Sequence, residues 1–198
     1  MGLAATELML GRTALGARLK DARSVLRYLR GRADLDPSRI ALWGESFAAL
    51  NEQPILLDQN PGQRPGPQTI HEADPVGGLL ALLTALYDEE VRAVAARGAL
   101  ISYRSVLQDR FCYVPLDVIV PGILQNADLP DVVAALAPRA VLLESPVDGK
   151  DRTVAADAAA SQLADALTAY KAAPAHLLIR GHAAEPGLAA WIATSLSR

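Results

Sequence analysis

The sequence predicts an α/β fold in which helices cover both faces of a mostly parallel sheet. Short apolar segments alternate with longer stretches whose apolar residues recur every three or four positions. Turn residues such as Asp, Pro and Gly separate them. Such alternation is typical of parallel strands joined by helices. The chain has 198 residues, with 51% hydrophobic and 21% charged, and shows no internal repeat. We therefore predict a single domain over residues 1–198.

Three helices and one strand are predicted before residue 90. Apolar residues from Leu15 recur with helical spacing, and the turn residues that follow lead into a buried strand over Ile40–Trp43. A brief helix is expected directly after this strand. A loop rich in Pro, Gly and amides comes next, and a helix spans residues 78–87.

The second half continues the alternation. A strand is predicted over Val91–Ile101, followed by a loop with aromatic and proline residues over 103–124. Asp128 is the expected N-cap of a helix that has Pro130 in its first turn. The remaining predicted elements are a strand at 140–143, a helix at 153–172, a strand at 176–179 and a helix at 187–196.

Bulk properties limit the functional classes. A net charge of -3 gives no electrostatic reason to expect nucleic acid or an anionic membrane as partner. No apolar run reaches the ~18 residues of a transmembrane helix, and no signal peptide is visible. Cys112 is the single cysteine, which excludes an internal disulfide and fits a cytoplasmic protein. Its apolar neighbours predict a small buried side chain rather than a nucleophile.

A serine follows the first predicted strand in a pattern that suits a nucleophile. Gly44-Glu45-Ser46-Phe47-Ala48 matches the Gly-x-Ser-x-Gly nucleophile elbow, with alanine in the last place. In that elbow a sharp, strained turn between strand and helix exposes the serine hydroxyl, and the next backbone N–H faces the developing oxyanion. The alternative is a glycine that ends the strand, followed by a serine that caps a helix.

A base and an acid occur in the expected order after Ser46. Asp148 follows the predicted strand at 140–143, and His182 follows the last predicted strand. Asp151 lies in the same loop as Asp148 and is the alternative acid. We favour Asp148 because it lies nearer the end of its strand.

The other two histidines have structural interpretations. His176 begins a strand, where a structural role is expected. His71 has acidic neighbours at positions 72 and 74, but adjacent residues in a loop without helical spacing indicate a solvated turn rather than a metal site.

Three segments resemble the α/β-hydrolase superfamily, especially its acetyl xylan esterase, dienelactone hydrolase and prolyl-oligopeptidase-like branches. They are DPSRIALWGESFAA (36–49), VRAVAARGALISYRSVL (91–107) and DLPDVVAALAPRAVLLESPVDG (128–149). The resemblance runs from about Leu15 to the C-terminus. It implies hydrolysis of short-chain carboxylic esters through an acyl-serine, without a cofactor or metal. Ser46 would be the nucleophile, Asp148 the acid, His182 the base, and the Phe47 backbone amide an oxyanion donor.

The chain also departs from that family. Several strands usually precede the nucleophile strand, whereas only 39 residues precede Ile40 here. We therefore expect a truncated α/β-hydrolase-like three-layer sandwich that corresponds to the C-terminal two-thirds of the usual domain. The loop that normally supplies the second oxyanion donor is not visible. The nucleophile strand would be an exposed edge, so we predict a homo-oligomer that covers it.

Three functions remain open from the sequence. The first is a serine esterase acting on small-molecule esters. The second is a weak or inactive hydrolase-like protein that acts as a binding or structural module. The third is a peptidase, thioesterase or lactonase that uses the same three residues. Substrate preference would depend on the loops at 51–77 and 102–127.

Overall fold

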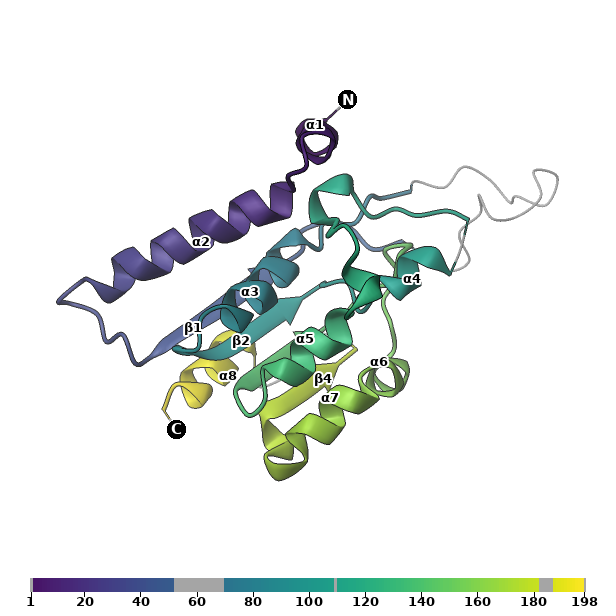
Figure 1. Ribbon diagram of the computed structural model, residues 1–198. Coiled ribbons are helices and arrows are strands. Elements are labelled where there is room, and N and C mark those ends of the chain that lie inside the picture. Colours follow the sequence, from purple (N-terminus) through teal and green to yellow (C-terminus); the bar gives the residue numbers. More distant parts are fainter. Residues whose placement is uncertain (1, 52–69, 109, 182–186, 198) are drawn as a thin grey trace.

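A computed structural model describes residues 2–51, 70–108, 110–181 and 187–197. Its sheet has four parallel strands in the order β1-β2-β3-β4, which is also their order along the chain (Figure 1). The strands are β1 (Ile40–Glu45), β2 (Val91–Arg97), β3 (Ala140–Glu144) and β4 (Leu177–Arg180). Consecutive parallel strands of this kind need a crossover between each pair, and helices supply it here.

The α-helices are α1 (Leu3–Met9), α2 (Ala14–Arg30), α3 (Val76–Leu86), α4 (Arg104–Leu107), α5 (Leu129–Ala135), α6 (Ala156–Gln162), α7 (Ala164–Ala169) and α8 (Leu188–Ser195). Helices α3, α5 and α7 share one core cluster with the sheet, and α2 packs against α3. Helix α8 forms a separate cluster with β2, β3 and β4. The predicted class is confirmed as a parallel α/β sandwich of three layers, with helices on both faces (Figure 1).

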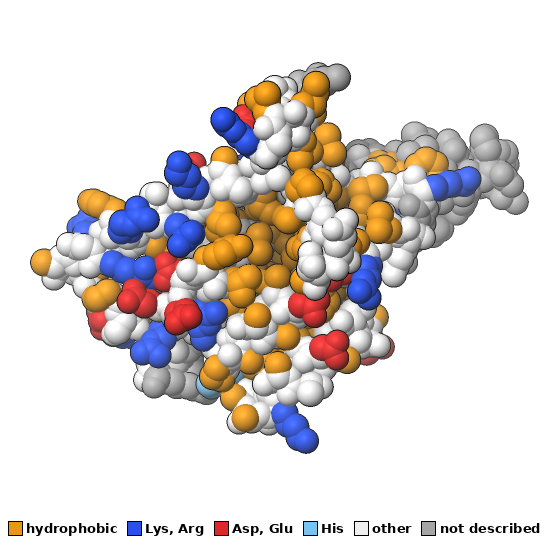
Figure 2. Space-filling view, viewed as in Figure 1, with side chains coloured by type: hydrophobic (Ala, Val, Ile, Leu, Met, Phe, Trp, Pro, Cys, Tyr) orange, Lys and Arg blue, Asp and Glu red, His pale blue; other side chains and the backbone are white. Residues whose placement is uncertain are grey.

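Alternate residues of the strands face these two helical layers. Val94, Val141 and Leu143 lie in the larger cluster, whereas Ala95 and Leu142 contact the α8 layer. Hydrophobic side chains gather between α2 and α5, where α3 lies (Figure 2). Because both faces of β2 and β3 are covered, these strands are apolar at successive positions, as expected for parallel strands.

A local sequence signal correctly located the start of α5. Asp128 caps α5 in a capping box, in which the Asp131 side chain accepts from the Asp128 N–H at 2.7 Å. Pro130 occupies the first turn, as predicted. The helix expected over 153–172 is interrupted at Leu163, which leaves helical geometry between α6 and α7 (φ −98°, ψ 20°).

Four other expectations were wrong. β1 does not stop at Gly44 but continues to Glu45, and residues 46–51 form no helix after it. The strand predicted over 91–101 ends at Arg97. Cys112 is exposed rather than buried, because it lies in a loop whose apolar neighbours are themselves only partly covered. Within the described ranges no helix is long and apolar enough to cross a membrane.

Candidate active site

The candidate site lies where the four strands end. Ser46, Gly98, Ser145 and Gly181 are the first residues after β1, β2, β3 and β4. Backbone hydrogen bonds continue past the strands: Ser46 N–H donates to Arg97 O at 3.0 Å, and Ser145 N–H donates to Arg180 O at 2.8 Å. The carboxyl ends of parallel strands form the usual place for ligand sites in open α/β sheets.

Glycines allow α3 to cross the end of β1 at close range. A Cβ atom on Gly44 would overlap the carbonyl group of Gly77, and one on Gly77 would lie 2.6 Å from Glu45 O. Gly98 has a positive φ of 65°, and a Cβ there would lie 2.6 Å from the Ser46 Cβ. The first glycine of the motif, Gly44, is therefore explained by packing against a helix that begins only at Val76.

Ser46 does not adopt the strained turn that the elbow motif predicts. Positive φ values at described non-glycine residues occur at Ser145 (49°) and Asp151 (57°), not at Ser46. The Ser46 Oγ accepts a hydrogen bond from the Ala48 N–H at 3.3 Å, so the hydroxyl lies in a local turn. The Phe47 side chain is 86% exposed, and no described acceptor binds its backbone N–H.

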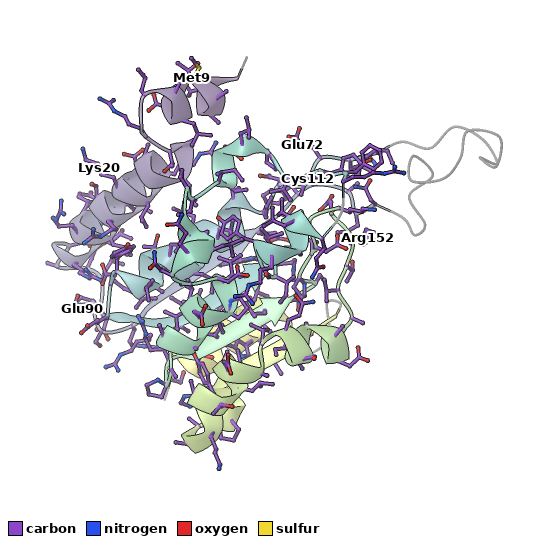
Figure 3. The ribbon with its side chains drawn as sticks, turned by 45° about the vertical axis from the view of Figure 1, so that its right-hand side comes forward. Met9, Lys20, Glu72, Glu90, Cys112 and Arg152 are labelled. Atoms are coloured by element: carbon purple, nitrogen blue, oxygen red, sulfur yellow. The ribbon has the colours of Figure 1, made fainter. Side chains whose placement is uncertain are left out.

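Three loops meet at this end of the molecule. The buried side chain of Asn51 donates to His71 O at 2.8 Å and to Lys150 O at 2.9 Å, and its own N–H donates to Asp151 O at 2.9 Å. The loop of Cys112 joins them, since the Tyr113 N–H donates to Gly149 O at 2.9 Å. Figure 3 shows the labelled residues Glu72, Cys112 and Arg152 together at this end.

The two candidate acids have different surroundings. The Asp148 carboxylate forms two hydrogen bonds with the Arg152 guanidinium, at 2.8 and 2.6 Å, and accepts from the backbone N–H groups of Lys150 and Arg152. Asp151 is 1% exposed, and its Oδ2 has no hydrogen-bond partner among the described residues. A buried carboxylate oxygen without a partner is costly, so such a group commonly has a functional explanation.

Burial also changes the ionisation of Asp151. It raises the pKa of this carboxyl to about 7, and the nearby charges of Asp148 and Asp74 act in the same direction. The positive φ of Asp151 is a backbone conformation that non-glycine residues seldom adopt. Strained backbone, burial and a perturbed pKa together are typical of functional sites.

A row of alternating charges lies directly beneath the site. Glu45, Arg97, Glu144 and Arg180 are the last residues of the four strands and are paired in register across the sheet. Arg97 binds Glu45 at 2.7 Å and Glu144 at 2.6 Å, and Arg180 lies 3.7 Å from Glu144. Glu144 is 1% exposed, so its charge depends on these arginines. We call this set the charge ladder.

The remaining site predictions have mixed outcomes. His182, the predicted base, lies outside the described residues. His176 has a structural contact, with its Nδ1 2.6 Å from Pro138 O. The His71 backbone is fixed by Asn51, and the described part of the chain holds no cluster of three metal-ligating side chains.

The sequence analysis missed the charge ladder and the bridging role of Asn51. A signal for the ladder exists, because each apolar strand ends in a charged residue and the sign alternates along the chain. That signal is interpretable only once the strand order is known. Asn51 has no comparable signal, since its three contacts join residues that are 20 to 100 positions away.

Comparison with known proteins identifies the fold but no family. No family model matches the chain, and no curated protein matches it. Among solved structures, a Bacteroides fragilis protein provisionally assigned as an acetyl xylan esterase superimposes with a TM-score of 0.60 at 16% sequence identity. The match covers 95% of this chain but 41% of that protein. The likeness shows a shared arrangement of strands and helices.

Proposed function

We propose that this chain is a serine hydrolase of the α/β-hydrolase type that cleaves carboxylic esters of short-chain acids. The observation that supports this most directly is the pair of polar groups at the carboxyl end of the sheet. Ser46 follows the first strand, and the buried carboxyl of Asp151, whose Oδ2 has no hydrogen-bond partner among the described residues, lies in the loop after the third. The structural neighbour, provisionally assigned as an acetyl xylan esterase, favours acetyl esters within this class.

In the proposed reaction Ser46 Oγ attacks the ester carbonyl and forms an acyl-serine. His182 accepts the hydroxyl proton, passes it to the leaving alcohol, and then activates water to release the acid. A carboxylate fixes the imidazole orientation and stabilises its charged form. The Phe47 N–H would donate to the oxyanion.

We assign the acid to Asp151 in preference to Asp148, our first choice from the sequence. The Asp148 carboxylate is already occupied by Arg152 and two backbone N–H groups. Asp151 retains an oxygen that could accept the imidazole N–H, and that bond would favour its ionised form.

A fluorophosphonate probe tests whether Ser46 is activated, without knowledge of the substrate. We expect a single adduct on the Ser46 peptide by mass spectrometry and none in Ser46→Ala. Ser195→Ala is a suitable control, because its hydroxyl already donates to Trp191 O at 2.9 Å. Faster turnover of p-nitrophenyl acetate than of p-nitrophenyl esters with longer acyl chains would then support the short-chain preference.

The two acids are distinguished by the labelling rate. Asp151→Asn should slow labelling by on the order of 10⁴-fold, the effect of losing the carboxylate that orients the base. Asp148→Asn should stay within a few-fold of wild type, once circular dichroism shows that it is folded. The reverse pattern would return the role to Asp148.

One observation favours a second candidate, a hydrolase-like binding module without catalysis. Ser46 lacks the strained backbone, and no helix follows it within residues 46–51. Failure of the folded wild-type protein to react with the probe would select this candidate. Peptidase, thioesterase or lactonase activity would instead appear as Ser46-dependent turnover of the matching substrate.

A further inference from the structure

A cavity lies at the amino-terminal end of the strands, opposite the candidate active site. It has a volume of about 730 Å³ and is open to solvent. Residues that precede or begin all four strands line it, together with helix α8. The lining includes the cationic side chains of Arg39, Arg92 and Arg139, the imidazole of His176, and Arg180 from the last position of β4, and no Asp or Glu among the described residues. This concentration of positive charge contrasts with the net charge of -3 for the whole chain.

Arg39 and Arg92 each use one guanidinium N–H in a described hydrogen bond and keep their Nη donors for a ligand. The Nε of Arg39 donates to Leu196 O, and the Nε of Arg92 donates to Ser38 O, both at 3.3 Å. These bonds orient the guanidinium groups. Neither forms an ion pair with a described carboxylate, although Asp36 lies close enough to Arg39 to sense its charge. Their Nη groups are therefore available to bind an anion at the β1 and β2 ends of the cavity.

The other cations contribute differently. Arg139 is held by backbone carbonyls, with Nη1 2.6 Å from Ala85 O and 3.0 Å from Asp88 O, and Arg180 belongs to the charge ladder. Arg139 therefore supplies positive potential, whereas the charge of Arg180 is offset by Glu144. His176 Nδ1 contacts Pro138 O, so its Nε2 is a donor only when the imidazole is protonated. The partly buried side chains of Leu178 and Trp191 form an apolar wall beside these groups.

We propose that this cavity is a binding site for an organic phosphate monoester. Two guanidinium groups with free Nη donors match a dianion with three terminal oxygens, whereas a carboxylate offers two oxygens and one charge. The wall of Leu178 and Trp191 would cover the organic part of the ligand. The site is separate from Ser46, which follows the opposite end of β1, so this proposal does not depend on the proposed hydrolase activity.

Isothermal titration calorimetry of the wild-type protein at pH 7.5 and constant ionic strength tests the site. The ligands are phenyl phosphate, inorganic phosphate and benzoate. We expect saturable binding that is tightest for phenyl phosphate, weaker for inorganic phosphate and weakest for benzoate. This comparison needs no variant. Benzoate binding as tightly as phenyl phosphate, or no saturable binding of either phosphate, would overturn the proposal, and equal affinity for both phosphates would contradict the apolar wall.

Single-residue variants test whether phenyl phosphate binds at these arginines. Arg39→Gln and Arg92→Gln should each weaken phenyl phosphate binding by about tenfold, since each removes a charge-assisted hydrogen-bond donor. Arg27→Gln is the matched control, because Arg27 is an exposed arginine on α2 that does not line the cavity. An equal loss in Arg27→Gln would indicate general surface charge and overturn the site. Ser46→Ala should bind like wild type, so loss of hydrolysis leaves this result interpretable.

Discussion

At the scale of single residues, the two aspartates of the loop after β3 differ in the hydrogen-bond partners of their carboxylates. Their distance from the end of the strand does not distinguish their roles. Asp148 is closer to the strand, yet its carboxylate is neutralised by Arg152 at 2.6 Å. Asp151 is buried, strained and without a partner for Oδ2 among the described residues. Sequence order could not make this distinction, because both residues lie within one loop of ordinary turn composition.

The raised pKa of Asp151 makes stability depend on pH. An aspartate in the unfolded chain titrates near 4, whereas burial raises the pKa of folded Asp151 to about 7. Between these values the folded protein binds more protons than the unfolded chain, so the free energy of unfolding should fall as pH rises from about 4 to 7.

The Asp151→Asn variant should remove this pH dependence. At pH 8 we expect it to be more stable than wild type by on the order of 2 kcal/mol, because it no longer buries a charge. Urea unfolding at several pH values measures this. Asp21→Asn, an exposed site on α2, is the control and should follow the wild-type curve. A wild-type free energy that increases over this range would contradict the prediction.

At the scale of elements, close packing of α3 on β1 depends on the absence of a side chain at position 44. Gly44→Ala should destabilise the protein by about 3 kcal/mol, because the added methyl group overlaps the Gly77 backbone and α3 must shift. Gly31→Ala is a matched control, since a Cβ there would make only ordinary contacts, with Tyr28 O at 3.5 Å and Arg27 O at 3.9 Å. Similar urea midpoints for both variants would show that the crossing is looser than the structure indicates.

The charge ladder joins the carboxyl ends of all four strands. Arg97→Met should cost about 3–5 kcal/mol, because it leaves Glu144 buried with only Arg180 nearby. Adding Glu144→Gln should recover much of the loss, since the buried charge is then gone. A double-mutant cycle from urea unfolding measures this coupling. Additive losses would mean that Arg97 acts through packing alone.

At the scale of the whole molecule, β1 is an edge strand that pairs with β2 only in the described structure. Trp43 is 51% exposed on the face of the sheet opposite α3. An apolar edge of this kind favours association with another chain. The sequence-based proposal of a homo-oligomer therefore has a defined surface in this structure.

Light scattering coupled to size exclusion tests this proposal. We expect a dimer or larger species whose fraction increases with concentration. Trp43→Lys should shift the population toward monomer, because a charge at the edge opposes association. Tyr28→Lys, at a 65% exposed position on α2, should leave the distribution unchanged. A monodisperse wild-type monomer at high concentration would contradict association through this edge.

Local chemistry allowed the sequence by itself to determine much of the architecture. Apolar runs separated by turn residues located the four strands and indicated that they are parallel. The capping pattern of Asp128 and Pro130 fixed the start of α5, because an N-cap depends on residues within one helical turn. The position of Ser46 directly after a strand was also predictable, since it needs only the apolar run that precedes it.

Tertiary structure alone decided the features that depend on residues distant in sequence. Gly44 lies inside β1 because α3, which begins 32 residues later at Val76, packs against it. The helix expected after Ser46 is absent within 46–51, where Asn51 instead joins two remote loops. The charge ladder, the Asp151 oxygen that has no partner among the described residues, and the arginines of the amino-terminal cavity all arise from strand register and burial. Residues adjacent in the sequence do not determine these features, because the contacts that create them form only when the sheet assembles.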